Sequence, residues 1–416
     1  MSNIKITGGK RLEGTISVQG AKNSVLPILA AAILVNGESR LQNCPNLKDV
    51  DAAIMILEHL GCKITRNEQE IVIDSSSLDK SEIPDHLMRE MRSSVIFLGA
   101  ILGRTGRATL STPGGCELGK RPINLHIDAL RQLGAEIDVK GPSIDARADR
   151  LVGCTVNFET PSVGATENAM LAALCAEGET IITNAAREPE IVDLQNFLVA
   201  AGAKIRGAGQ STIVVSGGAK LRPVTYSIMP DRIVACTYLC AVASTGGHLE
   251  MTNIIPEHIE AVTNCLETAG CKIEISGSNL VMVVKKRINA LRPIITRPYP
   301  GFPTDAQPCL VASCATAKGT TVVIENIFDN RYGYVDELRR MGADIKLEGR
   351  VAIVTGVKRL TGATVKATDL RGGAALVVAA LAAAGETEIT EIAHIDRGYD
   401  RLEETLSALG ADITRT

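Results

Sequence analysis

The chain has 416 residues, of which 45% are hydrophobic and 22% charged, ordinary values for a globular protein of two or three domains. Aromatic residues make up only 3% and tryptophan is absent, which argues against a protein that stacks single-stranded nucleic acid on aromatic side chains. The formal net charge of −3 gives no reason to expect nucleic acid or an anionic membrane as a partner.

The predicted elements begin with two short strands, 4–7 and 15–18, whose polar and apolar residues alternate and do not resemble a signal peptide. The longest apolar runs, 25–35 and 374–384, have 11 residues each, which suits a buried helix but is too short to cross a bilayer. The 11 cysteines form no CxxC pair, so neither a disulfide framework nor a structural zinc site is expected. We therefore expect a cytoplasmic protein with reduced thiols.

A short phrase recurs six times: an apolar or small residue, glycine, a small residue, a polar residue and isoleucine. Its glycines are Gly61, Gly134, Gly202, Gly270, Gly342 and Gly410, which are 73, 68, 68, 72 and 68 residues apart. This near-constant period predicts repeated supersecondary units. In each copy the glycine follows an amphipathic helical pattern and precedes a strand-like alternation, so we expect it to end the helix in the left-handed conformation.

Each copy contains a second, more apolar helix upstream of the amphipathic one. Its apolar character on all sides predicts burial, with the amphipathic helix outside. Short strands such as 180–183 and 320–325 follow these helices. The predicted apolar helices are 24–34, 93–102, 167–175, 233–243, 306–315 and 372–383. Six such units exceed one hydrophobic core, so two domains of three units each are expected, with a boundary near the proline-containing segment 222–230.

Charged residues recur where the apolar helices begin. The predicted starts lie near Lys22, Arg92, Thr166, Asp231, Asp305 and Asp369. An Asp or Thr can cap a first turn, whereas a cation there opposes the helix dipole unless an anion is bound. A second set of charges follows the middle strands, at Arg121, Arg187, Arg331 and Arg397. If the repeats pack with three-fold symmetry, two facing domain ends would form an anion-binding cleft lined by Lys22, Arg92, Arg121, Arg371 and Arg397.

Cys116 differs from most of the other cysteines, such as Cys175, Cys236 and Cys240, which lie among apolar residues and are expected to be core thiols. It lies in a segment, 111–122, that contains three glycines and two prolines, which favours an exposed loop. Lys120 and Arg121 would favour its thiolate form. Such a thiol can act as a general acid or a nucleophile. The loop offers no histidine as a base, which argues against a protease-like cysteine.

The sequence resembles the UDP-N-acetylglucosamine 1-carboxyvinyltransferase family over essentially its whole length. The motifs that carry the resemblance are Gly20-Ala21-Lys22-Asn23-Ser24, Met91-Arg92-Ser93-Ser94, Pro113-Gly114-Gly115-Cys116, Gly119-Lys120-Arg121-Pro122-Ile123-Asn124-Leu125-His126, Ser162-Val163-Gly164-Ala165-Thr166, Ala186-Arg187-Glu188-Pro189-Glu190-Ile191, Pro303-Thr304-Asp305 and Asp369-Leu370-Arg371-Gly372-Gly373. The resemblance implies an α/β fold of two inside-out α/β barrel domains, built from six βαβαββ-type units. It places residues 1–20 and 230–416 in one domain and residues 21–229 in the other.

The resemblance also implies a reaction of peptidoglycan synthesis, and so of cell-wall biogenesis, cell shape and division. Phosphoenolpyruvate gives its enolpyruvyl group to the 3′-hydroxyl of UDP-N-acetylglucosamine by addition and elimination, and phosphate leaves. No metal or organic cofactor is implied, and the expected partners are these two small molecules, without nucleic acid, membrane or a required oligomer. Cys116 resembles the family's proton donor, which forms a covalent adduct with phosphoenolpyruvate and is alkylated by fosfomycin.

Other site residues follow from the same resemblance. Asp305 corresponds to the base for the sugar hydroxyl, and Asp369 to a proton relay, although its position also suits a helix cap. The residues resembling the phosphoenolpyruvate clamp are Lys22, Arg121, Arg371 and Arg397. Those resembling the UDP-sugar site are Asn23, Arg92, Pro122, Ile123, Asn124, Leu125, Ser162, Val163, Gly164 and Ile327. His126 is expected to be structural.

Two alternatives remain open at this point. One is 5-enolpyruvylshikimate-3-phosphate synthase, which shares the fold and the chemistry but lacks the loop cysteine. The other is a non-catalytic repeat scaffold, which would require neither the repeated charges nor a reactive thiol. The segment around Cys116 favours the UDP-sugar enzyme over both.

Overall fold

The computed structural model describes residues 2–91, 93–111 and 123–416. These residues form two compact units. Unit 1 comprises the described residues up to Gln19 together with Pro230–Thr416, and unit 2 comprises the described residues from Gly20 to Met229.

Unit 2 contains three four-stranded sheets, each with its own helices. The first repeat comprises β14 (Thr225–Ser227), α1 (Lys22–Ala32), β3 (Glu38–Gln42), α2 (Lys48–His59), β4 (Lys63–Asn67) and β5 (Glu70–Asp74). The second comprises β6 (Glu82–Ile83), α3 (Asp85–Glu90), the 3₁₀ turn η1 (Ser94–Ile96), α4 (Phe97–Thr105), β7 (Arg107–Ser111), α5 (Asn124–Gln132), β8 (Glu136–Lys140) and β9 (Ser143–Arg147). The third comprises β10 (Thr155–Asn157), α6 (Val163–Ala173), β11 (Glu179–Thr183), α7 (Pro189–Ala200), β12 (Lys204–Arg206) and β13 (Thr212–Ser216).

Unit 1 repeats the same plan. Its first repeat comprises β2 (Leu12–Ser17), α8 (Arg232–Thr245), β15 (Gly247–Thr252), α9 (Pro256–Thr268), β16 (Lys272–Ser276) and β17 (Asn279–Val284). The next comprises β18 (Ile294–Ile295), α10 (Gln307–Cys314), β19 (Thr320–Ile324), η2 (Arg331–Tyr334), α11 (Val335–Arg340), β20 (Asp344–Glu348) and β21 (Val351–Thr355). The last comprises β22 (Thr364–Lys366), α12 (Leu370–Ala382), β23 (Glu386–Thr390), η3 (Ile392–Arg397), α13 (Leu402–Ala408), β24 (Asp412–Arg415) and β1 (Ile4–Thr7).

All six sheets share one pairing pattern. Each sheet has two neighbouring parallel strands, as β10 and β11 are, followed by two strands in antiparallel order, as β13 and β12 are. Three strands come from distant parts of the chain: β14 completes the sheet of β3, β2 pairs with β15, and β1 lies between β23 and β24. The α/β fold class and its six βαβαββ repeats are therefore confirmed.

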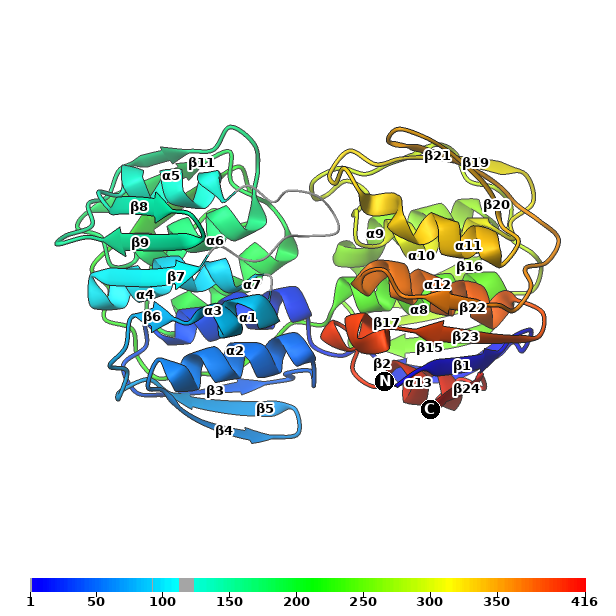
Figure 1. Ribbon diagram of the computed structural model, residues 1–416, viewed down its shortest axis with the longest axis horizontal. Helices are drawn as coiled ribbons and strands as arrows, with labels where there is room; N and C mark the ends of the chain where they lie inside the picture. The colour runs from blue at the N-terminus through cyan, green and yellow to red at the C-terminus, as the bar shows by residue number, and fades with distance from the viewer. Residues whose placement is uncertain (1, 92, 112–122) are drawn as a thin grey trace. The chain divides into compact units, whose positions relative to one another are not determined.

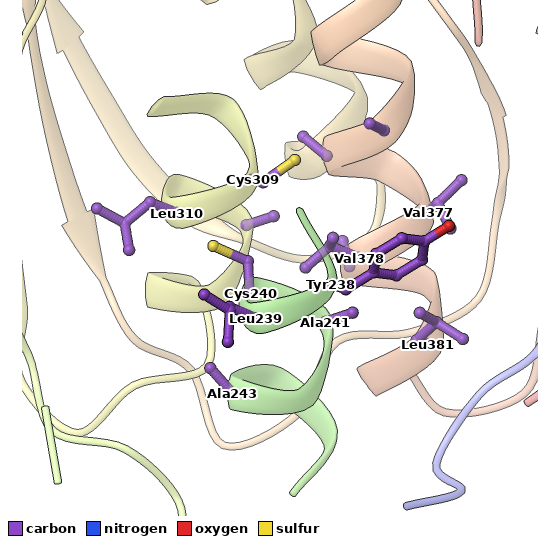
Figure 2. Packing of buried hydrophobic residues seen from close by; sticks show 14 of the residues in the cluster. Tyr238, Leu239, Cys240, Ala241, Ala243, Cys309, Leu310, Val377, Val378 and Leu381 are labelled. Carbon is purple, nitrogen blue, oxygen red and sulfur yellow. The ribbon is translucent and has the colours of Figure 1, made fainter. Parts of the chain in front are cut away.

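The apolar helices form the interior of each unit. In unit 1, α8, α10 and α12 contact one another, and every residue of α10 is buried. Figure 2 shows Leu239 and Cys240 of α8 packed near Leu310 of α10 and Val378 of α12. Figure 1 shows the strands of this unit running around these helices. In unit 2, α4 contacts both α1 and α6. Among the described residues, no helix is long and apolar enough to cross a membrane.

The glycines of the recurring phrase have the predicted conformation. Their φ angles lie between 87° and 106°, in the left-handed region that glycine adopts without steric cost. In each case an amphipathic helix ends just before the glycine and a strand begins just after it. Each recurrence of the phrase in the sequence therefore marks the same helix end in one structural repeat.

Two predictions about unit 2 are wrong in detail. α6 begins at Val163 and not near Thr166, because the Ser162 hydroxyl caps the helix by accepting from the Ala165 N–H at 3.4 Å. α6 also ends earlier than predicted, at Ala173. Cys175 therefore lies beyond the helix and is exposed, although we expected a core thiol. Cys236 and Cys240 are buried, as predicted, and burial raises the pKa of Cys236 to about 12.

Candidate functional site

The starts of the three buried helices of unit 1 carry three aspartates in equivalent positions. Asp231 caps α8, accepting from the N–H groups of Ile233 and Val234 at 2.8 and 3.1 Å. Asp369 caps α12, accepting from the N–H groups of Arg371 and Gly372 at 3.0 Å each. The sequence predicted both caps. Asp305 differs, because it lies two residues before α10 and binds side chains instead.

Asp305 is held by two buried guanidinium groups. Arg331 donates to Asp305 Oδ1 through Nη2 at 2.6 Å, and Arg371 donates to Oδ2 through Nε at 3.3 Å. The side chains of Arg331 and Arg371 are 1% and 3% exposed, whereas that of Asp305 is 28% exposed. The Asp305 carboxylate is therefore accessible, whereas the two arginines that hold it are buried. Its two cationic partners fix its position and favour its ionised, proton-accepting form.

The Arg331 side chain also binds the backbone next to Asp305. Its Nε and Nη2 atoms donate to the Thr304 carbonyl at 3.2 and 2.9 Å, so the arginine holds both residues of the Thr304-Asp305 pair. Its guanidinium carbon also lies 5.4 Å from the centre of the Phe328 ring. The sequence placed Arg331 among charges that follow the middle strands, but gave no sign that it would be fully buried.

Arg371 is fixed on its other side by Tyr399. Arg371 Nη1 donates to the Tyr399 hydroxyl at 3.3 Å, and the guanidinium carbon lies 5.5 Å from the centre of the tyrosine ring. Thr237 donates to the Ile233 carbonyl at 2.9 Å, so the Tyr399 hydroxyl donates its own proton to Thr237 Oγ1, also at 2.9 Å. Burial alone would lower the pKa of Arg371, but Tyr399, Asp305 and Asp231 raise it above its ordinary value. Arg371 is therefore a permanent cation.

A buried carboxylate connects Asp305 with the segment that carries Ile327. Glu325 is 0% exposed, and its Oε1 accepts from the N–H groups of Ile327 and Phe328 at 2.8 and 3.1 Å. Its Oε2 accepts from the Thr304 hydroxyl at 3.0 Å. Ile327 itself is 38% exposed. This arrangement ties the turn after β19 to the start of α10, and leaves an apolar side chain accessible beside them.

Arg397 lies at the end of η3 and is half-buried. Tyr399 follows it by two residues, so η3 and the start of α12 bring this part of the chain to the Asp305 network. The structure thus gathers Asp305, Arg371 and Asp369 around one group of helix starts, with Arg397 on the adjoining turn.

In unit 2, Lys22 is the first residue of α1 and is 7% exposed. Its ammonium group lies 2.7 Å from Oδ2 of Asp49, a residue of α2 that is 1% exposed. A buried charge needs such a partner, because desolvation without one would be costly. Asn23 follows Lys22 and is half-buried. Asp49 was not singled out from the sequence, where it reads as an ordinary acidic residue in a first helical turn.

The starts of α5 and α6 bring two predicted binding segments together. Ile123, Asn124 and Leu125 begin α5, with Asn124 exposed and the two apolar residues half-buried. Ser162 caps α6, and Val163 and Gly164 form its first turn, all half-buried. A Cβ atom on Gly164 would lie 2.9 Å from Cε1 of His126, so the two helices touch where the glycine leaves room.

His126 is a buried structural residue, as predicted. Its Nδ1 lies 2.8 Å from Nδ2 of Asn168, which also donates to the Val95 carbonyl at 2.9 Å. Asn168 Oδ1 accepts from the Gly99 N–H at 2.6 Å, which fixes the orientation of the amide. His126 Nδ1 is therefore the acceptor, and the ring proton lies on Nε2. Burial lowers the pKa of His126 to about 4, so the ring is neutral.

The start of α6 in unit 2 and the arginines near Asp305 in unit 1 both have the chemistry of anion sites. The first N–H groups of α6 have no partner within the helix, and the helix dipole places partial positive charge there. In unit 1, Arg371 and Arg397 supply full positive charge, and Arg331 holds Asp305 together with Arg371. Among the described residues, no cluster of three or more His, Cys, Asp or Glu side chains has the arrangement of a metal site.

Four predicted site residues cannot be placed. Arg92, Cys116, Arg121 and Pro122 lie outside the described residues. Three other residues were not predicted as part of a site although they hold candidate residues: Tyr399, Asp49 and Glu325. The position of Tyr399 two residues after Arg397 was the one local signal in the sequence that could have drawn attention to it.

Comparison with known proteins gives consistent similarities over the whole chain. A profile of the EPSP synthase (3-phosphoshikimate 1-carboxyvinyltransferase) family matches residues 6–406. The chain is 52% identical to UDP-N-acetylglucosamine 1-carboxyvinyltransferase 2 of Caldanaerobacter subterraneus subsp. tengcongensis, with 100% of both chains covered. It is 47% identical to UDP-N-acetylglucosamine 1-carboxyvinyltransferase of Geotalea uraniireducens, with 100% of this chain and 99% of that protein covered.

Solved structures show the same fold. The enolpyruvyl transferase NikO from Streptomyces tendae superimposes with a TM-score of 0.90 at 27% identity, covering 100% of this chain and 99% of that one. EPSP synthase from Acinetobacter baumannii gives a TM-score of 0.77 at 20% identity, again covering 100% of this chain and 99% of that one, and so is similar in fold alone. The full-length relatives at 47–52% identity are thus much nearer to this chain than the EPSP synthase structures are.

Proposed function

Because this chain belongs to the UDP-N-acetylglucosamine 1-carboxyvinyltransferase family, we propose that it transfers the enolpyruvyl group of phosphoenolpyruvate to the 3′-hydroxyl of UDP-N-acetylglucosamine. Phosphate is the second product. The reaction would serve peptidoglycan synthesis, and through it cell-wall growth and division, in the cytoplasm. Residues 1–20 with 230–416 and residues 21–229 would act as its two domains.

The chemistry has two steps. In the addition step, C3 of phosphoenolpyruvate accepts a proton, and the sugar oxygen bonds to C2 as its hydroxyl proton passes to a base. In the elimination step, C3 loses a proton and the C2–O bond to phosphate breaks, which restores the double bond. The protein must therefore hold a base near the hydroxyl, provide a proton donor near C3, and neutralise phosphate and carboxylate.

Asp305 is the base in this proposal, and its geometry is the observation that carries it. It is a carboxylate with an accessible edge, held by two guanidinium groups that are almost completely buried. Buried partners restrict the carboxylate to one position, which is what a positioned general base requires. They also offset the negative charge of the group in the resting state.

Phosphoenolpyruvate carries a phosphate and a carboxylate, and we assign its clamp to Lys22, Arg371 and Arg397, with Arg121. Arg371 is a permanent cation whose orientation is set by Tyr399, and guanidinium groups match the planar geometry of carboxylates. Lys22 would share its charge between Asp49 and the substrate. Cys116 would donate the proton to C3, form the covalent phosphoenolpyruvate adduct, and be the site of fosfomycin alkylation.

The UDP-sugar would be bound largely by unit 2. The Ser162-capped start of α6, with Val163 and Gly164, supplies N–H groups suited to a diphosphate. Ile123 and Leu125 offer apolar side chains to the uracil, together with Pro122, while Asn124 and Arg92 supply polar contacts. Asn23 would contact the N-acetylglucosamine, and the exposed Ile327 would contact the sugar nucleotide as well.

Asp369 has a structural role as the cap of α12. We propose that it also relays a proton, because the cap uses only Oδ1 for its two backbone contacts. Its Oδ2 contacts the Thr368 hydroxyl at 3.4 Å, a length at which a hydrogen bond is weak.

Phosphate release tests the proposed function against its alternatives. The protein is incubated with phosphoenolpyruvate and either UDP-N-acetylglucosamine or shikimate 3-phosphate, and each reaction is repeated after treatment with fosfomycin. We expect release with the UDP-sugar alone, and its loss after fosfomycin. Release with shikimate 3-phosphate would instead assign the chain to EPSP synthases, and release with neither acceptor would favour a binding scaffold.

A further inference from the structure

A cavity at the far end of the unit 1 helices is lined by five cations. The cavity has a volume of about 240 Å³ and lies at the C-terminal ends of α8, α10 and α12. Its charged lining consists of Arg11, Lys285, Lys286, Arg287 and Lys358, without any aspartate or glutamate. The candidate active site lies at the other ends of the same helices. The 14 residues of α8 span about 20 Å, so the cavity is separate from that site.

Helix C-termini attract cations, because the helix dipole places partial negative charge there. Each end behaves as roughly half a negative charge, and three ends amount to about one and a half. Five cations exceed this demand, and Arg287 already meets part of it beside the end of α10. Its Nη2 donates to the carbonyls of Ala317, Val357 and Gly356 at 2.8, 2.7 and 3.1 Å, and its Nε donates to the carbonyl of Thr316.

The other four cations remain without such a role. In the described part of the chain, Arg11, Lys285, Lys286 and Lys358 make no ion pair and no side-chain hydrogen bond. They reach the cavity from three places in the fold: before β2, after β17 and after β21. Several exposed cations of this unit, such as Lys272 with Glu274, have an acidic neighbour instead.

Four unpaired positive charges around one concave surface repel one another and produce a strong local field. In a chain whose net charge is −3, such a concentration is not a consequence of overall composition. An anion bound among these groups would remove the repulsion. Lysine ammonium groups act as point charges that suit compact, multiply charged oxyanions, and the volume admits a small molecule.

We propose that this cavity binds a small polyanion of the phosphate class. The fixed Arg287 guanidinium forms one wall of the site. The side chains that would contact the bound anion from the other walls are those of Arg11, Lys285, Lys286 and Lys358. Because the lysines and Arg11 are exposed, affinity falls as ionic strength rises.

The test is a calorimetric titration of the full-length protein with inorganic pyrophosphate at two salt concentrations. The pocket variant K285A/K286A/K358A is compared with a control variant, K272A/K346A/K366A, which removes the same charge from exposed lysines on strands of the same unit. Melting temperatures verify that both variants fold. The comparison does not depend on the proposed enzyme activity, because pyrophosphate bound at the candidate active site would be equal in the two variants.

We expect wild type and the control variant to bind pyrophosphate alike, and the pocket variant to lose at least about tenfold in affinity for one site. A parallel titration with ADP distinguishes the source of the phosphate, because a nucleotide ligand would bind more tightly than free pyrophosphate. Equal binding by the pocket and control variants would overturn the proposal. So would wild-type protein that binds pyrophosphate no more tightly than millimolar at physiological salt.

Discussion

Tyr399 is the residue that sets the direction of the Arg371 guanidinium. The arginine donates to the tyrosine hydroxyl at 3.3 Å and lies 5.5 Å from the centre of its ring, while its Nε contacts Asp305. Both residues are 3% exposed. The tyrosine hydroxyl is itself fixed through Thr237. A chain of buried contacts therefore runs from the α8 backbone to the accessible edge of Asp305.

Removal of the tyrosine hydroxyl tests this positioning role. Tyr399→Phe keeps the ring but takes away one hydrogen-bond partner of Arg371. The loss of one such hydrogen bond changes a binding constant by about fivefold to tenfold. We expect the KM for phosphoenolpyruvate to rise by this factor, with the KM for UDP-N-acetylglucosamine unchanged. The measurement is steady-state kinetics with each substrate varied in turn.

Tyr238→Phe is a matched control, because Tyr238 is another buried tyrosine of unit 1 that, among the described residues, forms no hydrogen bond or cation–π contact with Arg371. It is expected to cost similar stability without the selective change in KM. If the two variants changed the kinetics equally, Tyr399 would be no more than a packing residue.

Substitution of Asp305 tests the base. Asp305→Asn keeps the size of the side chain and one acceptor oxygen, so the contacts with the arginines are only partly lost. We expect both substrates to bind while turnover falls by about 10² to 10⁴, the usual contribution of a general base. Calorimetric binding and kcat are measured on the same preparation. Turnover within a few-fold of wild type would remove Asp305 from the chemistry.

Asp369→Asn separates a helix cap from a proton relay. Asparagine caps helices about as well as aspartate, so the melting temperature is expected to stay within about two degrees. The amide cannot carry a proton between groups, so turnover is expected to fall by at least about tenfold. Unchanged turnover at an unchanged melting temperature would leave Asp369 with the cap alone.

The buried His126 predicts a pH dependence of stability. Burial lowers its folded-state pKa to about 4, below the unfolded value of 6.5, so protonation favours the unfolded chain. The contribution of the neutral ring to the free energy of unfolding is complete above pH 6.5. It is lost as the pH falls from 6.5 towards 4, by about 3 kcal/mol in total.

Denaturant unfolding at pH 7, 6, 5 and 4.5 measures this contribution. His126→Gln cannot be protonated, so the stability difference between wild type and the variant should shrink steadily below pH 6.5. Carboxylates titrate in both proteins and cancel in the comparison. A difference that does not change with pH would show that His126 is not the group responsible.

The sequence predicted the repeats well because they depend on local chemistry. A helix that ends at Gly202 or Gly342 needs a residue with positive φ, and this need recurs in every copy. The apolar helices were recognisable for the same reason. The start of α6 was misplaced because the prediction relied on apolar periodicity and overlooked the cap at Ser162. The predicted end of the same helix was also too late, and Cys175 lies beyond it and is exposed.

Long-range relationships were beyond the reach of local patterns. The pairing of β2 with β15 and of β14 with β3 joins strands far apart in the chain, and nothing in a six-residue strand specifies so distant a partner. The same limit applies to the site. The repeats located Asp305 at a helix start and the resemblance supplied its role, whereas its contact with Arg331 and the link from Arg371 to Tyr399 depend on how α10, η2 and α12 pack.

Direct observation of the transferred group tests the central claim most closely. The protein is incubated with UDP-N-acetylglucosamine and phosphoenolpyruvate labelled with ¹³C at all three carbons, and the nucleotide sugar is examined by mass spectrometry and NMR. We expect the UDP-sugar to gain all three labelled carbons as an enol ether at the 3′-oxygen, with one phosphate released for each product. An unmodified UDP-sugar, under conditions in which the protein is folded and binds it, would contradict enolpyruvyl transfer.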